Sequence, residues 1–204
     1  ATTGRLFTDA HAASAVCTPS RYGLLTGEYP WRAGIRSPVF SQHGLIIDPD
    51  KTTLADLFDR AGYATAIIGK WHLGFGGEAP DWNGDLKPGP LELGFDHFYG
   101  VPVVNSHPPF LYVENHRVVG LDPGDPLVYG RNRPNPLAQP FPEKNTRPMK
   151  TGLGFSGGTA AHARYRDAEV ATHLTEKAIS WMEAQGDHPF FLLLSTTNIH
   201  HPFT

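Results

Sequence analysis

The chain has 204 residues, of which 40% are hydrophobic and 18% are charged, and its net charge is −3. This composition excludes a disordered chain, and the weak negative charge argues against nucleic acid or an anionic membrane surface as a partner. No apolar run approaches the roughly 18 residues that span a bilayer. The single cysteine, Cys17, excludes an internal disulfide.

Neither end of the sequence has the features of a natural terminus. The start, "ATTGRLFTDAH", lacks the basic and apolar segments of a signal peptide, and the end, "LLLSTTNIHHPFT", directly follows an apolar run. We therefore expect residues 1–204 to be part of one longer domain that continues at both ends.

The first predicted elements are a short strand over residues 5–9 and a helix that ends at Gly27. Pro19 suits the first turn of that helix, where its missing N–H costs nothing. Cys17 then lies at the positive helix end, and Arg21, four residues later, shares its face. An anion could be held there, although a lone cysteine is also compatible with a simple core position.

A second helix and a buried strand follow over residues 53–69. Thr53 suits an N-cap, Gly62 a helix stop, and "YATAIIG" a buried strand over residues 63–68. The spacing predicts an apolar helix face formed by Leu54, Leu57, Phe58 and Ala61.

A similar helix–strand unit ends the chain. Residues 164–186 place apolar side chains every fourth position, at Val170, Leu174, Ala178 and Met182, and a nearly unbroken apolar strand covers residues 190–196. Two such units predict an α/β fold with a mostly parallel sheet flanked by helices. Residues 120–158, with seven prolines and no periodicity, are predicted to be a Pro/Gly-rich loop insertion.

Polar clusters follow three of the predicted strands. "CTPSR" comes after residues 5–9, "GKWHLG" after residues 63–68, and "NIHHPF" after residues 190–196. In open α/β sheets, ligands bind beyond the carboxyl ends of the strands. We therefore expect these clusters to form one site, although Lys70 and His72 alone would also suit a solvated loop.

Three stretches of the sequence carry a resemblance to a known family. "CTPSRYGLLTG" resembles the C-x-P-S-R-x-x-x-L-T-G motif of the type I, formylglycine-dependent sulfatases. "GKWHLG" is similar to their second motif, and "GFDHFYG" at residues 94–100 to a further recurring stretch. The resemblance implies an alkaline-phosphatase-like sulfatase fold, of which residues 1–204 form part of the catalytic domain, and hydrolysis of sulfate esters.

The resemblance also implies how the site works. A maturation enzyme oxidises the cysteine at the Cys17 position to formylglycine, whose hydrate attacks sulfur with one hydroxyl and expels sulfate with the other. Arg21 would fix the hydrate, Lys70 would contact sulfate and the hydrate, and His72 would bond the hydroxyl that later loses its proton. His200, two residues before Pro202, would lie near the leaving-group oxygen, with His201 the weaker candidate.

The family binds Ca²⁺ or Mg²⁺, and here the sequence departs from its pattern. The upstream Asp-Asp pair, the late Asp-Asn pair and a late second lysine have no counterpart, so that only matured Cys17 remains as an expected ligand. Val104 stands where many relatives carry a serine, beside Asn105 and Ser106. We therefore expect residues 1–204 alone to be inactive, whereas the parent protein is active.

Several alternatives remain open from the sequence. Related enzymes with the same cysteine motif cleave phosphonate monoesters or phosphodiesters, and a pseudoenzyme could bind sulfated ligands without turnover. The resemblance implies an exported protein that acts on a sulfated small molecule or glycan. Tyr129, Arg131 and Arg133 in the loop insertion are candidates for the pocket rim, or for a surface loop without a binding role.

Overall fold

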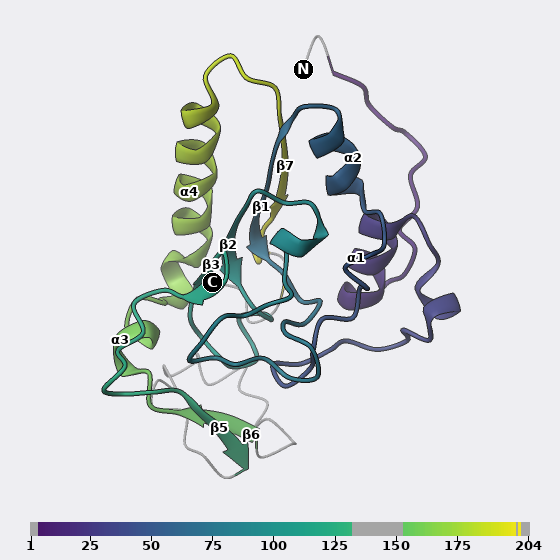
Figure 1. Cartoon of the computed structure of the whole chain (residues 1–204). Coiled ribbons are helices and arrows are strands. Elements are labelled where there is room, and N and C mark those ends of the chain that lie inside the picture. The colour runs from purple at the N-terminus through teal and green to yellow at the C-terminus, as the bar shows by residue number, and fades with distance from the viewer. Residues whose placement is uncertain (1–3, 132–152, 199, 201–204) are drawn as a thin grey trace.

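The computed structural model describes residues 4–131, 153–198 and 200. Its helices are α1 (Cys17–Thr26), α2 (Leu54–Arg60), α3 (Thr159–His162) and α4 (Val170–Gln185), with 3₁₀ turns at Pro30–Ala33, Leu91–Leu93 and Asp167–Glu169. Its strands are β1 (Ala64–Lys70), β2 (His97–Val101), β3 (Val113–Glu114), β4 (Arg117–Val118), β5 (Val128–Arg131), β6 (Leu153–Ser156) and β7 (Phe190–Ser195). Figure 1 shows their arrangement.

A five-stranded sheet forms the centre of the structure, in the order β4-β3-β2-β1-β7. The central strand β1 runs parallel to both neighbours, β2 and β7, whereas β3 and β4 are antiparallel. The predicted α/β fold with a parallel sheet core is therefore confirmed, and the short antiparallel strands make the sheet mixed.

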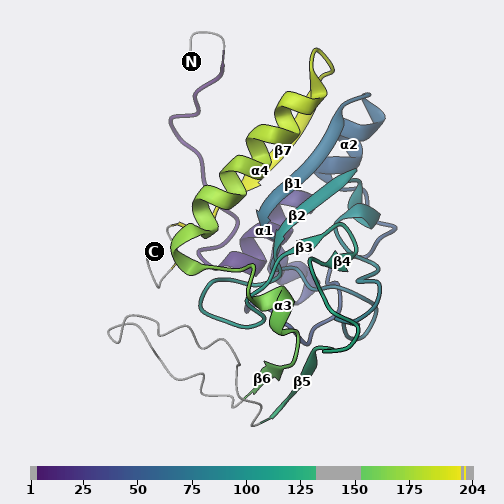
Figure 2. The ribbon, with the colours of Figure 1, turned by 90° about the vertical axis from the view of Figure 1, so that its left-hand side faces the viewer.

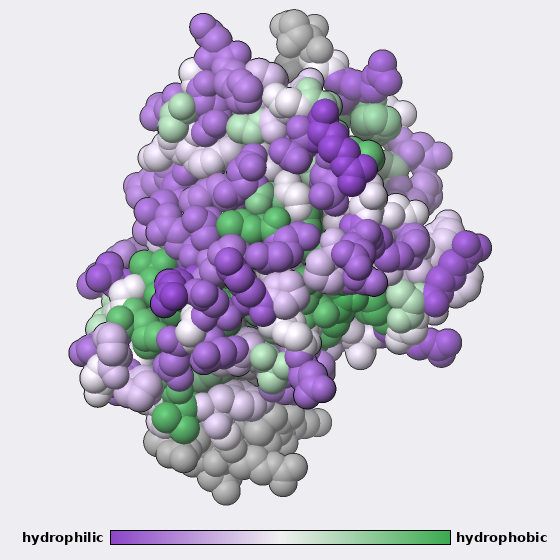
Figure 3. Space-filling view, viewed as in Figure 1, coloured by the Kyte–Doolittle hydropathy of each residue, from purple (hydrophilic) through white to green (hydrophobic). Residues whose placement is uncertain are grey.

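Helices cover both faces of the sheet: α4 lies on one face, and α1 and α2 on the other (Figures 1 and 2). Successive residues of β1 supply the two cores, because side chains alternate across a strand. Ile67 packs with side chains of α1 and α2, and Ile68 packs with side chains of α4. The outer face seen in Figure 3 is mostly hydrophilic, with apolar side chains in small separate patches.

Helix α2 begins and packs for identifiable reasons. Thr53 and Asp56 form a capping box, and the Thr53 hydroxyl also donates to the Leu93 carbonyl oxygen at 2.7 Å. The predicted apolar face is wrong at Leu57, which is 56% exposed, and at Ala61, which ends the helix and is also exposed. Because the helix has only two turns, its orientation is fixed by Ala55, which is fully buried, and by Phe58, whose ring stacks on Phe191. Leu57 therefore lies outside the packed side.

Two further predictions need correction. Residues 5–9 form no strand, and Leu6 and Phe7 are 86% and 71% exposed, because no neighbouring strand pairs with them in the described part of the chain. Strand β7 was expected to be buried throughout, yet Leu194 is 42% exposed. In the described sheet β7 is an edge strand that pairs only with β1, so one flank of its apolar side chains lacks a neighbour.

The predicted loop insertion over residues 120–158 contains some regular structure. Strands β5 and β6 pair antiparallel within it, and the Tyr129 hydroxyl donates to Gln42 at 3.1 Å. Arg133 and residues 132–152 lie outside the described residues. Among the helices that are described, none combines the length and apolarity needed to cross a bilayer.

We predict that Thr53→Ala lowers the free energy of unfolding by about 1–2 kcal/mol, because it removes an N-cap and a buried hydrogen bond. Thr53→Ser, which keeps the hydroxyl, should recover most of this loss, and the exposed neighbour variant Thr52→Ala should have little effect. Chemical unfolding of the purified variants measures the difference, and equal stability of Thr53→Ala and Thr52→Ala would contradict the role of the cap.

Candidate active site

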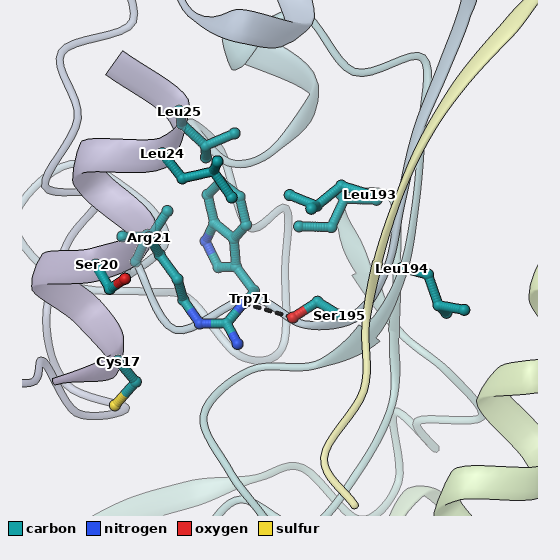
Figure 4. Close-up of a pocket in the computed structure, with 11 residues that line it drawn as sticks. Cys17, Ser20, Arg21, Leu24, Leu25, Trp71, Leu193, Leu194 and Ser195 are labelled. Atoms are coloured by element: carbon teal, nitrogen blue, oxygen red, sulfur yellow. Dashed lines mark hydrogen bonds between the residues drawn. The ribbon is translucent and has the colours of Figure 1, made fainter. Parts of the chain in front are cut away.

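A pocket of about 280 Å³ lies between the start of α1 and the end of β7, and Cys17, Arg21, Trp71 and Ser195 are among its lining residues. In Figure 4, the Cys17 sulfur and the Arg21 guanidinium lie at the same end of α1, and Arg21 reaches across to Ser195. Sequence motifs that are about 50 residues apart, "CTPSR" and "GKWHLG", thus meet at one edge of the sheet.

Arg21 is fixed by two hydrogen bonds from its guanidinium. Its Nη1 donates to the Lys70 carbonyl oxygen at 2.7 Å and to the Ser195 hydroxyl oxygen. Burial lowers the pKa of Arg21 to about 10, although the neighbouring Cys17 side chain acts in the opposite direction. The guanidinium is therefore a charged, positioned donor held at the ends of β1 and β7.

Lys70 is the last residue of β1, and its side chain is buried beside Cys17. Burial and the charge of Arg21 lower the pKa of Lys70 to about 8, while a hydrogen bond with the Cys17 side chain raises it. A buried ammonium beside a buried guanidinium is unfavourable unless an anion compensates the two charges. Lys70 and Arg21 therefore place two cationic groups at the Cys17 position, an arrangement that favours an anion.

His72 is held as a neutral imidazole. Its Nε2 lies 2.8 Å from the Val39 carbonyl oxygen, and because a carbonyl only accepts, Nε2 carries the proton. Burial and the charge of Lys70 lower the pKa of His72 to about 3. Its φ of 62° lies in the left-handed region, which is uncommon for a non-glycine residue and recurs at functional sites.

A closed set of hydrogen bonds ties His72 to the residue after Cys17. The Thr18 hydroxyl donates to the His72 carbonyl oxygen at 2.8 Å, and the Val39 N–H donates to the Thr18 hydroxyl oxygen at 3.2 Å. Since His72 in turn donates to Val39, the three residues form a ring of contacts. The ring fixes the distance between the "CTPSR" and "GKWHLG" motifs.

Three buried polar atoms beside the pocket have no hydrogen-bond partner among the described residues: Arg21 Nε, His72 Nδ1 and Thr197 Oγ1. Buried polar groups in proteins are nearly always paired, so unpaired ones near a pocket indicate a polar ligand or a further segment. His72 Nδ1 carries a lone pair and would accept a hydrogen bond from a hydroxyl group.

Sequence reasoning missed Ser195 and Thr18, although both belong to this site. Ser195 is the last residue of β7, and Thr18 directly follows Cys17. Their positions in the sequence gave only a weak signal of a functional role, because serine and threonine are common at strand ends and helix starts that belong to no site. Their importance lies in contacts with Arg21 and His72, which only the folded chain reveals.

The remaining predicted residues lie after β7, in the loop after β2 and in the loop insertion. His200 follows β7 in a turn, where its N–H donates to the Thr197 carbonyl oxygen at 3.0 Å, and its chemical role stays a prediction. Val104 and Asn105 are buried, and Ser106 bonds to His107. Tyr129 contacts Gln42, while the Arg131 side chain, Arg133, His201 and Pro202 lie outside the described residues.

The pocket does not fit a divalent cation with the residues at hand. In the part of the chain that the structure describes, no group of three or more His, Cys, Asp or Glu side chains could hold a metal ion. Arg21 and Lys70 carry positive charge beside Cys17, and positive charges repel a metal ion. The described pocket therefore suits an anion, and a metal ion would need carboxylate ligands from elsewhere.

Comparison with known proteins points to the same family by a family model and by individual relatives. A family model described as Sulfatase matches residues 1–204. The chain is 36% identical over 215 residues to the N-acetylgalactosamine-6-O-sulfatase of Bacteroides thetaiotaomicron, covering 98% of this chain and 42% of that protein. It is 31% identical over 220 residues to arylsulfatase G of Rattus norvegicus, covering 100% of this chain and 36% of that protein.

Solved structures agree with the sequence relatives. A structure from the metabolism of multiple glycosaminoglycans by Bacteroides thetaiotaomicron matches with a TM-score of 0.83 and 36% identity, covering 94% of this chain and 43% of that one. The PsFucS1 sulfatase from Pseudoalteromonas sp. matches with a TM-score of 0.56 and 21% identity over 94% of this chain and 36% of that one, which supports the fold alone. The chain thus spans less than half the length of these relatives.

The pKa of His72 predicts a specific loss of stability in acid. Its pKa is about 3 in the folded protein and about 6.5 in an unfolded chain. Between these values the unfolded state binds more protons, so the free energy of unfolding falls as the pH drops from about 6.5 toward 3, by up to about 1.4 kcal/mol per pH unit. His72→Gln, which keeps a donor for the Val39 carbonyl, should weaken this pH dependence.

Chemical unfolding at several pH values between 3 and 7 measures how the free energy of unfolding depends on pH. The variant His188→Ala, at an exposed histidine, is the matched control. If His72→Gln and His188→Ala showed the same pH dependence as the unchanged protein, the neutral, buried state of His72 would be wrong.

Proposed function

The chain belongs to the sulfatase family, and we propose that it is the part of a sulfate ester hydrolase that carries the nucleophile, at Cys17, and the sulfate-binding cations. One observation carries the proposal: Cys17 and Arg21 line one pocket, and the Arg21 guanidinium donates to the main chain of Lys70, whose side chain is buried. A sulfate ester is anionic, and its bound form would relieve the charge repulsion between Arg21 and Lys70.

We propose that Cys17 acts only after oxidation to formylglycine by a maturation enzyme. The hydrated side chain would supply one hydroxyl that attacks sulfur and a second hydroxyl whose deprotonation releases sulfate. His72 suits the second task, because its neutral Nδ1 can accept a hydrogen bond from a hydroxyl group. Arg21 and Lys70 would hold the nonbridging oxygens, on which negative charge develops.

Release of the alcohol needs a proton, and His200 is the proposed general acid. It follows the carboxyl end of β7, the same sheet edge at which Arg21 and Lys70 meet. We further propose that Ca²⁺ or Mg²⁺ acts with this site and that its carboxylate ligands come from parts of the protein outside this chain. Export from the cytoplasm and a sulfated small molecule or glycan as substrate complete the proposal.

The first experiment is the mass of one tryptic peptide. This chain is expressed together with a formylglycine-generating enzyme, and the peptide "LFTDAHAASAVCTPSR" (residues 6–21) is analysed. We expect conversion of the thiol to an aldehyde, seen as loss of one sulfur and two hydrogens and gain of one oxygen. A peptide that stays a thiol while a control substrate is converted would contradict the formylglycine proposal.

Turnover is then measured on the natural protein that contains this chain, with a panel of sulfate, phosphonate and phosphodiester substrates. Cys17→Ala should lower kcat on sulfate esters by roughly 10³-fold or more, because the nucleophile is removed. Cys17→Ser could attack but could not release its sulfate by the same route, so at most one turnover is expected. Preference for phosphonates would favour the related hydrolase, and binding without turnover would favour a pseudoenzyme.

Ser195 offers a test of how Arg21 is positioned. Ser195→Ala removes one of the two acceptors that hold the guanidinium, and we predict about a tenfold lower kcat/KM on sulfate esters, the range expected for one hydrogen bond to a charged group. Thr196→Ala, the exposed neighbour, is the matched control and should stay within about twofold of the unchanged protein. Equal activity of the two variants would show that Lys70 alone suffices to hold Arg21.

A further inference from the structure

We propose that Thr18 is a positioning residue for the hydrolysis: its buried hydroxyl holds His72 in a strained conformation that leaves Nδ1 open to take a proton from the nucleophile. This inference rests on the proposed function, in which His72 serves the release of sulfate. The motif C-x-P-S-R leaves the position after the cysteine open, so the motif itself assigns Thr18 no role.

Three hydrogen bonds fix the other polar atoms of His72. Its N–H donates to the Pro102 carbonyl oxygen at 3.0 Å, and its Nε2 donates to the Val39 carbonyl oxygen at 2.8 Å. Its own carbonyl oxygen accepts from the Thr18 hydroxyl at 2.8 Å. His72 is buried, and its Nδ1 has no partner among the described residues. The one polar atom left open is therefore the one that can accept a proton.

The backbone of His72 needs this support. Its φ of 62° lies in the left-handed region, which costs free energy for a residue with a side chain and persists only where the surroundings hold it. Two of the three hydrogen bonds restrain the main chain on either side of the Cα atom, one at the N–H and one at the carbonyl group. Without the bond from Thr18, the carbonyl group of His72 is free to rotate toward an ordinary conformation.

Thr18 is the only side chain that takes part in these three bonds, since Pro102 and Val39 contribute main-chain carbonyl groups. It is fully buried in the first turn of α1, directly after Cys17. Its hydroxyl is used twice, because it also accepts from the Val39 N–H at 3.2 Å. One hydroxyl thus ties the residue after the nucleophile to both partners of the contact between His72 and Val39, and a single substitution removes it.

This role predicts which kinetic constant depends on Thr18. In the proposed release step, a hydroxyl of the hydrated side chain gives its proton to His72 Nδ1 and its oxygen forms a double bond to carbon. The carbon–oxygen bond to sulfate breaks, and sulfate leaves with that electron pair. A displaced Nδ1 slows this step, because proton transfer depends steeply on the position of the acceptor. Arg21 is held by hydrogen bonds to β1 and β7, so binding of the ester should change little.

The test uses the natural protein that contains this chain and the sulfate ester that it turns over fastest. Thr18→Val keeps the size of the side chain but removes the hydroxyl, and we expect kcat to fall about tenfold or more while KM stays nearly unchanged. Thr18→Ala, which also removes the hydroxyl, should show the same split, and Thr18→Ser should recover most of the lost kcat. The mass of the tryptic peptide gives the aldehyde content of each variant, and kcat is calculated per aldehyde.

Thr53→Val is the matched control, because it removes another buried threonine hydroxyl that donates to a carbonyl oxygen, that of Leu93. It should destabilise the protein as Thr18→Val does, and its kcat should stay within about twofold of the unchanged protein. An equal fall of kcat in the two valine variants would assign the effect to stability and overturn the positioning role. Full activity of Thr18→Val would overturn it as well.

Crystal structures of the variants separate this inference from the proposed function. In Thr18→Val we expect His72 to leave the left-handed region or to lose the contact between Nε2 and Val39, whereas Thr18→Ser should keep both features. If the unchanged protein turns over no sulfate ester, the proposed function fails, and the structures alone decide whether Thr18 positions His72. An unmoved His72 in Thr18→Val would overturn the inference even where sulfate esters are hydrolysed.

Discussion

The site depends on a steric constraint at Gly69, where the main chains of three strands meet. A side chain at Gly69 would collide with the main chain of Ser195 on β7, and one at Gly100 on β2 would collide with the main chain of Gly69. Gly69 also has a φ of 122°, which L side chains rarely adopt. Because these two positions are glycine, Lys70 leaves β1 within reach of both neighbouring strands, and its carbonyl oxygen can accept from Arg21.

The close approach has an electrostatic consequence. Arg21 and Lys70 are buried together with the neutral His72, and burial lowers the pKa of each of the three groups. The pocket therefore carries an unfavourable charge arrangement that an anion would relieve. A ligand that binds only the folded state adds its binding free energy to stability, so the same residues that weaken the fold favour an anionic substrate.

Local features of the sequence predicted much of the fold. The Thr53 cap, the Gly27 stop, strands β1 and β7, and the burial of Val170, Leu174 and Ala178 in α4 were confirmed, because each depends on neighbours within a few residues. Met182, predicted on the same face of α4, is only half-buried. The failures concern contacts between distant segments. Leu57 is exposed because Phe191 and the sheet set the orientation of α2, and residues 5–9 form no strand without a partner in the described sheet.

The residues of the candidate site likewise fall into those that local motifs predicted and those that only the fold reveals. The positions of Cys17, Arg21, Lys70 and His72 followed from motifs, since each motif marks a strand end or a helix start. Ser195 and Thr18 could not be found in that manner, because a hydroxyl becomes part of a site only through the partner that the fold brings to it. The ring of contacts between Thr18, Val39 and His72 joins residues up to 54 positions apart, beyond any local pattern.

The cations of this site and the loops beside it are held in place by different parts of the fold. The cations come from α1 and β1, whose geometry is set by secondary structure, while Phe40, Ser106 and His107 lie in loops. Those loops are tied to the centre through main-chain atoms of Val39 and Pro102, which remain available whatever side chains the loops carry. Side chains of the loops can therefore change with the substrate while the contacts that hold His72 persist, so one anion-binding centre can serve several leaving groups.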